Sequence, residues 1–134
     1  MSVGILVITH SQIGQAIMDT ACSMLTQCPL DVEILPIPQD SDPERQAARA
    51  HDLVHKLNRG DGVLVLTDMY GSTPSNIASR LLDPEGRVQV VAGVNLPMFI
   101  RVMNYPHLNL EELTAKALSG GHDGIMACRP SVEG

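Results

Sequence analysis

The chain has 134 residues, of which 44% are apolar, and this allows one domain with a hydrophobic core. Its net charge is −6 and its basic residues form no cluster, which argues against a nucleic-acid partner. No apolar run approaches the roughly 20 residues needed to span a bilayer, and the start lacks signal-peptide features, so we expect a cytoplasmic protein.

Short apolar runs alternate with helical periodicity along the whole chain. Continuous apolar runs indicate strands that are covered on both faces, as in a parallel sheet. Alternation and Pro36 indicate that the second strand lies at a sheet edge. The predicted strands are 4–8, 32–37, 63–66 and 88–94. The predicted helices are 11–29, 42–57, 73–82, 96–105 and 110–118, the last stopped by Ser119, Gly120 and Gly121.

This order predicts an α/β fold with a mostly parallel sheet, right-handed crossovers and helices on both faces. A last apolar piece, 124–128, is consistent with one more strand. We therefore expect a single domain over residues 1–128, followed by a flexible tail over 129–134.

The cysteine count is odd, with Cys22, Cys28 and Cys128, so it predicts no disulfide framework. Cys22 lies on an apolar helix face, where packing is the expected role, and Cys28 with Pro29 ends that helix. Among the cysteines, no pair has the close spacing of zinc ligands. We expect reduced thiols, no metal site and no cofactor.

Polar residues follow the strands at the edge where an open α/β sheet binds its ligands. His10 lies between Thr9 and Ser11 after the first strand, and Asp68 comes after the third. If these two strands are neighbours, His10 and Asp68 face each other. The carboxylate then accepts one ring N–H and leaves the other ring nitrogen free as a nucleophile.

Groups that can bind a phosphoryl oxygen surround this pair. Ser11 and Thr73 are predicted to open helices, whose free N–H groups favour anions. Gly71 allows close approach of the backbone, and the hydroxyls of Thr9, Ser72 and Thr73 are candidate hydrogen-bond donors. Phosphoryl transfer depends mostly on positioning and charge stabilisation, so such a site needs no metal.

Structural explanations exist for each of these residues. His10 is also consistent with an ordinary loop residue, Asp68 with a turn cap, and residues 71–74 with a strand-to-helix connection. His51 and His55 have the spacing of metal ligands on a helix, but without a third ligand a solvated face is favoured. From the residues alone we infer a parallel α/β domain with a His–Asp anion site.

Three motifs carry a resemblance to a known family. They are Val7-Ile8-Thr9-His10, the run from Leu66 to Asn76 (LTDMYGSTPSN), and the run from Val91 to Met98 (VAGVNLPM). In this order and spacing they resemble the mannose-type IIA domains of the phosphoenolpyruvate-dependent sugar phosphotransferase system (PTS). The resemblance covers about residues 1–128.

The resemblance implies a phosphotransferase in which His10 accepts a phosphoryl group on Nε2 from the phosphocarrier protein HPr and donates it to a IIB domain. Asp68 would orient the ring through Nδ1. It further implies a sheet order of 2-1-3-4 and a homodimer in which the strand 124–128 pairs antiparallel with the partner's sheet. Membrane association would arise only through a permease complex.

Some positions depart from the family pattern. Tyr70 stands where Trp is frequent, and Ser72 and Ser11 stand where Gly is frequent. Two other functions stay open: a regulatory switch that signals by protein binding when phosphorylated, and a phosphoryl donor to a dihydroxyacetone kinase. A receiver domain is disfavoured, because its first strand would end in acidic residues rather than in Thr9 and His10.

Overall fold

The structure is a computed structural model that describes residues 2–131. The strands are β1 (Gly4–His10), β2 (Val32–Ile37), β3 (Val63–Thr67) and β4 (Val88–Ala92). The helices are α1 (Ile13–Met24), α2 (Pro43–Leu57), α3 (Thr73–Ser79), α4 (Leu96–Met103) and α5 (Leu110–Asp123). The alternation of strands and helices along the chain is therefore the predicted one.

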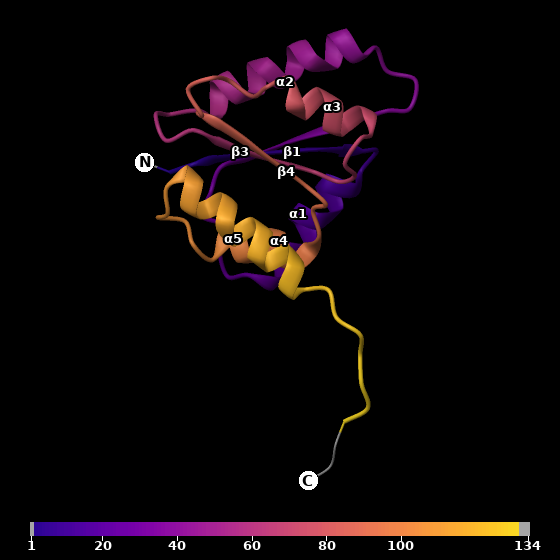
Figure 1. Ribbon diagram of the computed structural model, residues 1–134, viewed down its shortest axis with the longest axis vertical. Helices are drawn as coiled ribbons and strands as arrows, with labels where there is room; N and C mark the ends of the chain where they lie inside the picture. Colours follow the sequence, from indigo (N-terminus) through magenta and orange to yellow (C-terminus); the bar gives the residue numbers. More distant parts are fainter. Residues whose placement is uncertain (1, 132–134) are drawn as a thin grey trace.

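The four strands form one parallel sheet in the order β2-β1-β3-β4. Helices α2 and α3 cover one face of the sheet, and α1, α4 and α5 cover the other (Figure 1). The predicted α/β fold, strand order and edge position of β2 are confirmed. The connection from β1 leads to one side of the sheet and that from β3 to the other, so the ligand-binding switch point lies between β1 and β3.

Alternation along β1 divides the core into two halves. Ile5 and Val7 belong to the cluster packed under α1, α4 and α5, whereas Leu6 and Ile8 belong to the cluster under α2 and α3. All four side chains are fully buried. A strand covered on both faces requires apolar residues at successive positions, which explains the continuous run in the sequence.

Helix α5 continues past the predicted stop at Ser119. A Cβ atom on Gly120 would lie 2.5 Å from the Cβ of Arg101, and one on Gly121 would lie 2.8 Å from Cε of Met98. The two glycines therefore let α5 lie against α4 instead of ending the helix. The prediction that α5 ends at Leu118 was wrong, because close helix packing outweighed the low helix propensity of glycine.

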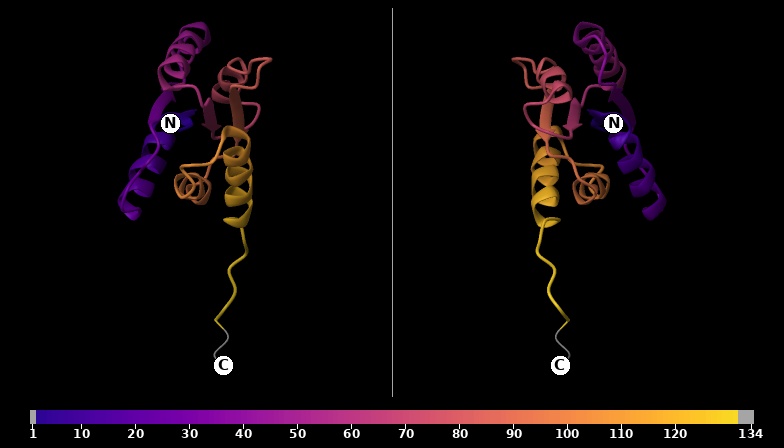
Figure 2. Two further views of the ribbon diagram at one scale, coloured as in Figure 1. Left: turned by 90° about the vertical axis from the view of Figure 1, so that its left-hand side faces the viewer. Right: turned by 90° about the vertical axis from the view of Figure 1, so that its right-hand side faces the viewer.

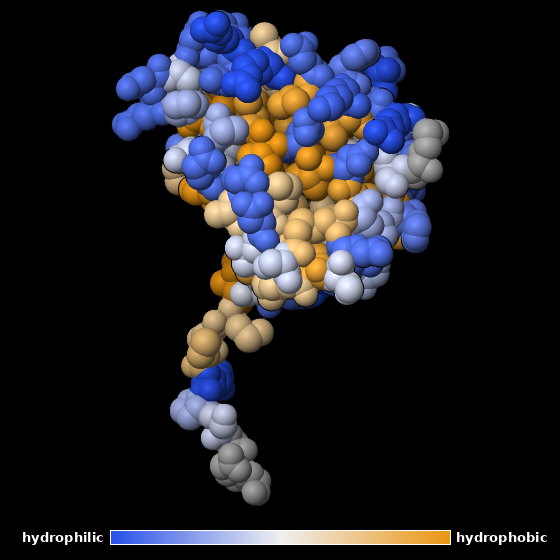
Figure 3. Space-filling model, turned by 180° about the vertical axis from the view of Figure 1, so that it is seen from behind, coloured by the Kyte–Doolittle hydropathy of each residue, from blue (hydrophilic) through white to orange (hydrophobic). Residues whose placement is uncertain are grey.

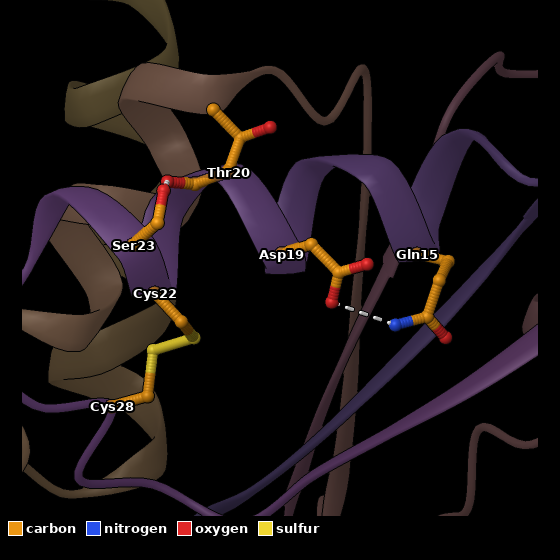
Figure 4. The surroundings of a disulfide bond; sticks show 6 residues. All are labelled: Gln15, Asp19, Thr20, Cys22, Ser23 and Cys28. Carbon is orange, nitrogen blue, oxygen red and sulfur yellow. Dashed lines mark hydrogen bonds between the residues drawn. A yellow bond between two sulfur atoms is a disulfide. The ribbon is translucent and has the colours of Figure 1, made fainter.

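A disulfide bond joins Cys22, in the last turn of α1, to Cys28 in the segment before β2 (Figure 4). Their Cα atoms lie 5.5 Å apart. The prediction of no disulfide was wrong, because an odd cysteine count still allows a single pair. Cys128 is free and exposed. Helix α1 ends at Met24, short of the predicted stop at Pro29, and the chain turns back toward β2.

Residues 125–131 form neither helix nor strand, and the chain leaves the body after α5 (Figure 2). The fifth strand predicted over 124–128 is absent from the single chain, in which Gly124 caps α5. Ile125 and Met126 are consequently exposed. Pairing of this segment with a partner chain stays a prediction. Of the predicted tail, residues 132–134 lie outside the described part of the chain.

The surface differs between the end formed by α2 and the middle of the body. Seen from behind, hydrophilic residues gather at the end formed by α2, and apolar residues form a band across the middle of the body (Figure 3). The outer side of α2 carries the exposed residues Arg45, Arg49 and Asp52. Within residues 2–131, no helix is long and apolar enough to cross a membrane.

Candidate active site

His10 and Asp68 meet at the switch point of the sheet. His10 is the last residue of β1, and Asp68 directly follows β3. Nδ1 of His10 lies 2.7 Å from Oδ2 of Asp68, and the main-chain N–H of His10 donates to the same oxygen at 3.0 Å. The expectation that these residues face each other is confirmed. One carboxylate oxygen thus holds both the ring and the backbone of the histidine.

The environment of Asp68 keeps its carboxyl group ionised at neutral pH. Burial raises the pKa of Asp68, but the hydrogen bonds from the ring and backbone of His10 and from the N–H of Met69 outweigh this effect and lower it. An ionised carboxylate only accepts hydrogen bonds, so Nδ1 of His10 carries the ring proton. Nε2 then has a free lone pair, and the His10 side chain is 45% exposed while that of Asp68 is 11% exposed.

A cavity of about 710 Å³ opens beside His10 on the α2–α3 side of the sheet. Its walls combine the histidine, hydroxyl groups, one amide and apolar side chains, and they include no Lys or Arg. The lining residues are His10, Ser11, Ile37, Pro38, Gln39, Ser41, Pro43, Thr73 and Pro74. Sequence reasoning missed the connection between β2 and α2. The signal was its position after a strand adjacent to β1, where ligand-binding loops are expected.

Thr9 does not line this cavity. Its side chain is fully buried, and its Oγ1 accepts a hydrogen bond from the N–H of Gly14 at 2.8 Å. The prediction that Thr9 contacts a phosphoryl group directly is therefore contradicted, because a side chain without exposed surface cannot meet one. Along β1, Thr9 follows Ile5 and Val7 to the α1 side of the sheet.

Ser11 is exposed and forms part of the cavity wall. It does not cap α1 as predicted. Gln12 occupies the cap position and makes no side-chain cap bond. Ser11 has a φ of 46°, and among the described residues it is the only non-glycine residue with positive φ. Its N–H donates to the carbonyl oxygen of Ile37 at 3.3 Å, which fastens this turn to β2.

The β3–α3 turn holds the other predicted phosphate-binding residues. Thr73 is exposed and lines the cavity, while Gly71 and Ser72 do not. Ser72 is the cap residue of α3, but its hydroxyl donates to the carbonyl of Met69. Gly71 has a φ of 85°, and its N–H donates to the buried Ser75 hydroxyl at 3.3 Å. Gly71 and Ser72 thus shape the turn that presents Asp68.

His51 and His55 have no third metal-ligating side chain placed beside them in the part of the chain that the structure describes. Both are exposed. Within residues 2–131, no group of three or more His, Cys, Asp and Glu side chains is placed to hold a metal ion.

Fold and site together define a class of protein: a parallel α/β domain with a half-exposed histidine, held by a carboxylate at the switch point. The EIIA-man family, described as "PTS system fructose IIA component", matches residues 4–118. The chain belongs to this family and is a IIA component of the mannose and fructose type of the phosphotransferase system.

Relatives of known name support this assignment. The chain is 28% identical over 131 residues to the PTS system mannose-specific EIIAB component of Escherichia coli (strain K12), covering 96% of this chain and 40% of that protein. The chain thus spans about two fifths of the length of this relative. It is also 29% identical over 84 residues to the PTS system fructose-specific EIIA component of Bacillus subtilis, covering 62% of this chain and 58% of that protein.

Solved structures share the fold over nearly the whole chain. The mannose/sorbose specific IIA subunit of the phosphotransferase system from Enterococcus faecalis superposes with a TM-score of 0.86 at 22% identity, covering 99% of this chain and 100% of that one. The PTS IIA protein associated with the fucose utilization operon from Streptococcus pneumoniae has a TM-score of 0.75 at 26% identity, with 95% and 96% covered.

Proposed function

We propose that this chain is a phosphocarrier that accepts a phosphoryl group on Nε2 of His10 from phospho-HPr and passes it to a IIB domain in sugar uptake. The observation that carries the proposal is the 2.7 Å contact between His10 Nδ1 and Asp68 Oδ2, which leaves Nε2 free beside an open cavity. Membership of the EIIA-man family supports the same assignment.

Transfer to this ring is a displacement at phosphorus. The Nε2 lone pair of His10 attacks the phosphoryl group on the donor's phosphohistidine, the new N–P bond forms, and the donor's N–P bond breaks as its imidazole leaves. Asp68 stabilises the positive charge that builds on the ring, because its carboxylate holds the Nδ1 proton. Donation to the next protein reverses these roles.

The cavity beside His10 supplies polar contacts without a fixed cation in its wall. We propose that the exposed residues Ser11 and Thr73 meet the phosphoryl oxygens. Gly71 and Ser72 contribute through the shape of the β3–α3 turn. Hydrogen bonds at this position hold the group weakly compared with an arginine fork, which suits a residue that must release its phosphoryl group again.

Phosphorylation of purified protein tests the proposal. The wild type and His10→Ala are incubated with phosphoenolpyruvate, enzyme I and HPr, and the intact mass is measured. We expect one phosphoryl group per wild-type chain and none on His10→Ala, with unchanged folding because the His10 side chain is half-exposed. Labelling that persists in the His10→Ala variant would refute the site.

Replacement of Asp68 separates orientation from nucleophilicity. In Asp68→Asn the nucleophile remains, but the amide cannot stabilise the positive ring, so we expect transfer to slow by about 10²–10³-fold. Single-turnover rates with phospho-HPr measure this effect. An unchanged rate would remove the orienting role from Asp68.

The acceptor decides between transport and regulation. Addition of a IIB domain from the same genome to the phosphorylated protein is expected to remove the label within seconds to minutes. If no IIB domain removes the label, transfer to a dihydroxyacetone kinase would assign the role of kinase donor. A change in the binding of a regulator on phosphorylation would instead assign the regulatory role. Assignment to the cytoplasm, where HPr acts, belongs to the same proposal.

We further propose a homodimer in which residues 124–128 add to the partner's sheet. Ile125 and Met126 support this, since they are 74% and 75% exposed in the single chain, and strand β4 is at an edge of the sheet. Sedimentation equilibrium is expected to give twice the 14.4 kDa chain mass. The double variant Ile125→Glu/Met126→Glu is expected to shift the protein toward monomer. A monomeric wild type contradicts the dimer.

A further inference from the structure

Thr9 is a buried polar residue that the proposed transfer reaction does not use. It lies beside the nucleophile in sequence, but its side chain points into the α1 side of the core and has no exposed surface. Its hydroxyl is occupied, because Oγ1 accepts the N–H of Gly14 at 2.8 Å. A buried hydroxyl with a defined partner indicates a positional role.

This bond replaces the missing cap of α1. Gly14 is the second residue of the helix, so its N–H has no partner within the helix, and the cap residue Gln12 offers none from its side chain. A Cβ atom on Gly14 would lie 3.2 Å from Oγ1 of Thr9 and 2.8 Å from Cγ1 of Val7. The first turn of α1 is therefore pressed against β1, with the Thr9 hydroxyl as its polar anchor.

The turn that carries His10 lies between Thr9 and Gly14, whose hydrogen bond joins its two sides. The N–H of His10 donates to Asp68 at 3.0 Å, and the N–H of Ser11 donates to Ile37 at 3.3 Å. At Ser11 the backbone of this turn adopts the left-handed conformation, with a φ of 46°. A non-glycine residue keeps this conformation only where its surroundings hold it on both sides. Thr9 and Gly14 provide the hold on the helix side.

We infer that Thr9 is a positioning residue: its buried hydroxyl fixes the β1–α1 turn and so keeps the ring of His10 aligned with Asp68. This inference rests on the proposed function of His10 as phosphoryl carrier. Loss of the hydroxyl leaves the N–H of Gly14 buried and unpaired, and the turn relaxes by moving away from β1. The ring then samples orientations in which Nδ1 is not bonded to Asp68.

Three variants isolate the hydroxyl. Thr9→Val keeps the shape of the side chain but removes the acceptor, and Thr9→Ser keeps the acceptor. Thr67→Val is the matched control, because Thr67 is equally buried at the end of the neighbouring strand β3 and its hydroxyl has no partner within residues 2–131. Each variant is compared with the wild type by single-turnover transfer from phospho-HPr and by ¹⁵N NMR of the His10 ring.

For Thr9→Val we expect the transfer rate at saturating phospho-HPr to fall about tenfold, since small misplacements of a nucleophile reduce rates strongly. The donor concentration at half-maximal rate should change less than about twofold, because Thr9 has no exposed surface that a docking protein could contact. When the ring is neutral, the wild type should show protonated Nδ1 and bare Nε2, and Thr9→Val a mixture of both tautomers. Thr9→Ser and Thr67→Val should match the wild type.

The inference fails if Thr9→Val matches the wild type in both rate and ring spectrum, or if Thr67→Val reproduces its changes. It also fails if Thr9→Ser does not restore them. The ring spectrum requires no phosphoryl transfer. A wild type that is never phosphorylated therefore refutes the proposed function, while the tautomer of His10 still tests the role of Thr9.

Discussion

The two ends of helix α1 are held by different chemistry. At the end next to His10, the N–H of Gly14 bonds to the Thr9 hydroxyl, and the preceding turn is bonded to β2 and to Asp68. At the far end, the bond between Cys22 and Cys28 closes a loop within one short stretch of chain (Figure 4). The site end thus depends on strands from distant parts of the sequence, whereas the far end depends on a covalent bond that a reductant can break.

This difference indicates how the two ends respond to change. Precise placement of His10 needs several weak contacts that agree with one another, so each contact there affects function. The disulfide lies at the opposite end of a 12-residue helix, and its loss should affect the stability of the fold more than the chemistry at His10.

Gly14→Ala disturbs the site end most strongly. The added methyl group would lie 2.8 Å from Cγ1 of the fully buried Val7, so we expect a loss of about 3 kcal/mol in the free energy of unfolding, together with slower phosphoryl transfer. Urea unfolding and single-turnover transfer measure the two effects. Thr20→Ala on the exposed side of the same helix is the control, with a change below about 0.5 kcal/mol. Wild-type stability in Gly14→Ala would contradict the close packing of α1 on β1.

Reduction of the disulfide tests the far end. A closed loop of this short length stabilises a protein by about 2 kcal/mol in the chain-entropy account, so reduction by dithiothreitol should lower the stability by that amount. Urea unfolding of oxidised and reduced protein measures it. Cys128→Ser should keep the difference, and Cys22→Ala/Cys28→Ala should abolish it. A transfer rate to His10 that changes more than about twofold on reduction would show that the two ends are coupled.

Ser11→Gly is expected to stabilise the turn beside His10, whereas Gly14→Ala destabilises it. Glycine adopts a φ of 46° without steric cost, and we expect a gain of about 0.5 kcal/mol after the greater freedom of glycine in the unfolded chain is included. Thermal unfolding measures this change. Ser11→Ala keeps the strain and is the control. A destabilised Ser11→Gly would mean that the serine side chain contributes contacts that outweigh the strain.

Acidification tests the contact between His10 and Asp68, and its effect is confined to low pH. The pKa of Asp68 is lowered in the folded protein, so the carboxylate contributes stability above its unfolded value of about 3.9 and loses it as the pH falls through the folded pKa. Stability measured from pH 7 down to pH 2 should therefore decline less steeply in Asp68→Asn than in the wild type. Parallel profiles for the two proteins would contradict the shift.

Much of the site could be predicted because it depends on chain order and on the edge of a parallel sheet. The adjacency of β1 and β3 brings His10 and Asp68 together wherever those residues end their strands. The burial of Thr9 also had a signal in the sequence, since side-chain alternation places it on the same face as Ile5 and Val7 and opposite His10.

Other features depend on packing that a single sequence does not show. The Ser119-Gly120-Gly121 run reads as a helix stop, yet Gly120 and Gly121 continue α5, and a Cβ atom on Gly120 would lie only 2.5 Å from the Cβ of Arg101 on α4. The pairing of Cys22 with Cys28 requires the chain to turn back directly after Met24, and this turn is set by how β2 joins the sheet. The predicted strand over 124–128 requires a neighbouring strand that one chain does not provide.

The single oxygen of Asp68 that accepts both the ring and the main-chain N–H of His10 has a further consequence. Backbone and imidazole form a closed ring of bonds with one carboxylate, so both torsions of the side chain are fixed when the protein folds. The entropy of aligning the nucleophile is then lost once, during folding, and is not lost again in each cycle of transfer. Docking of a phosphorylated partner has only to orient two preformed surfaces, which favours rapid exchange over tight binding.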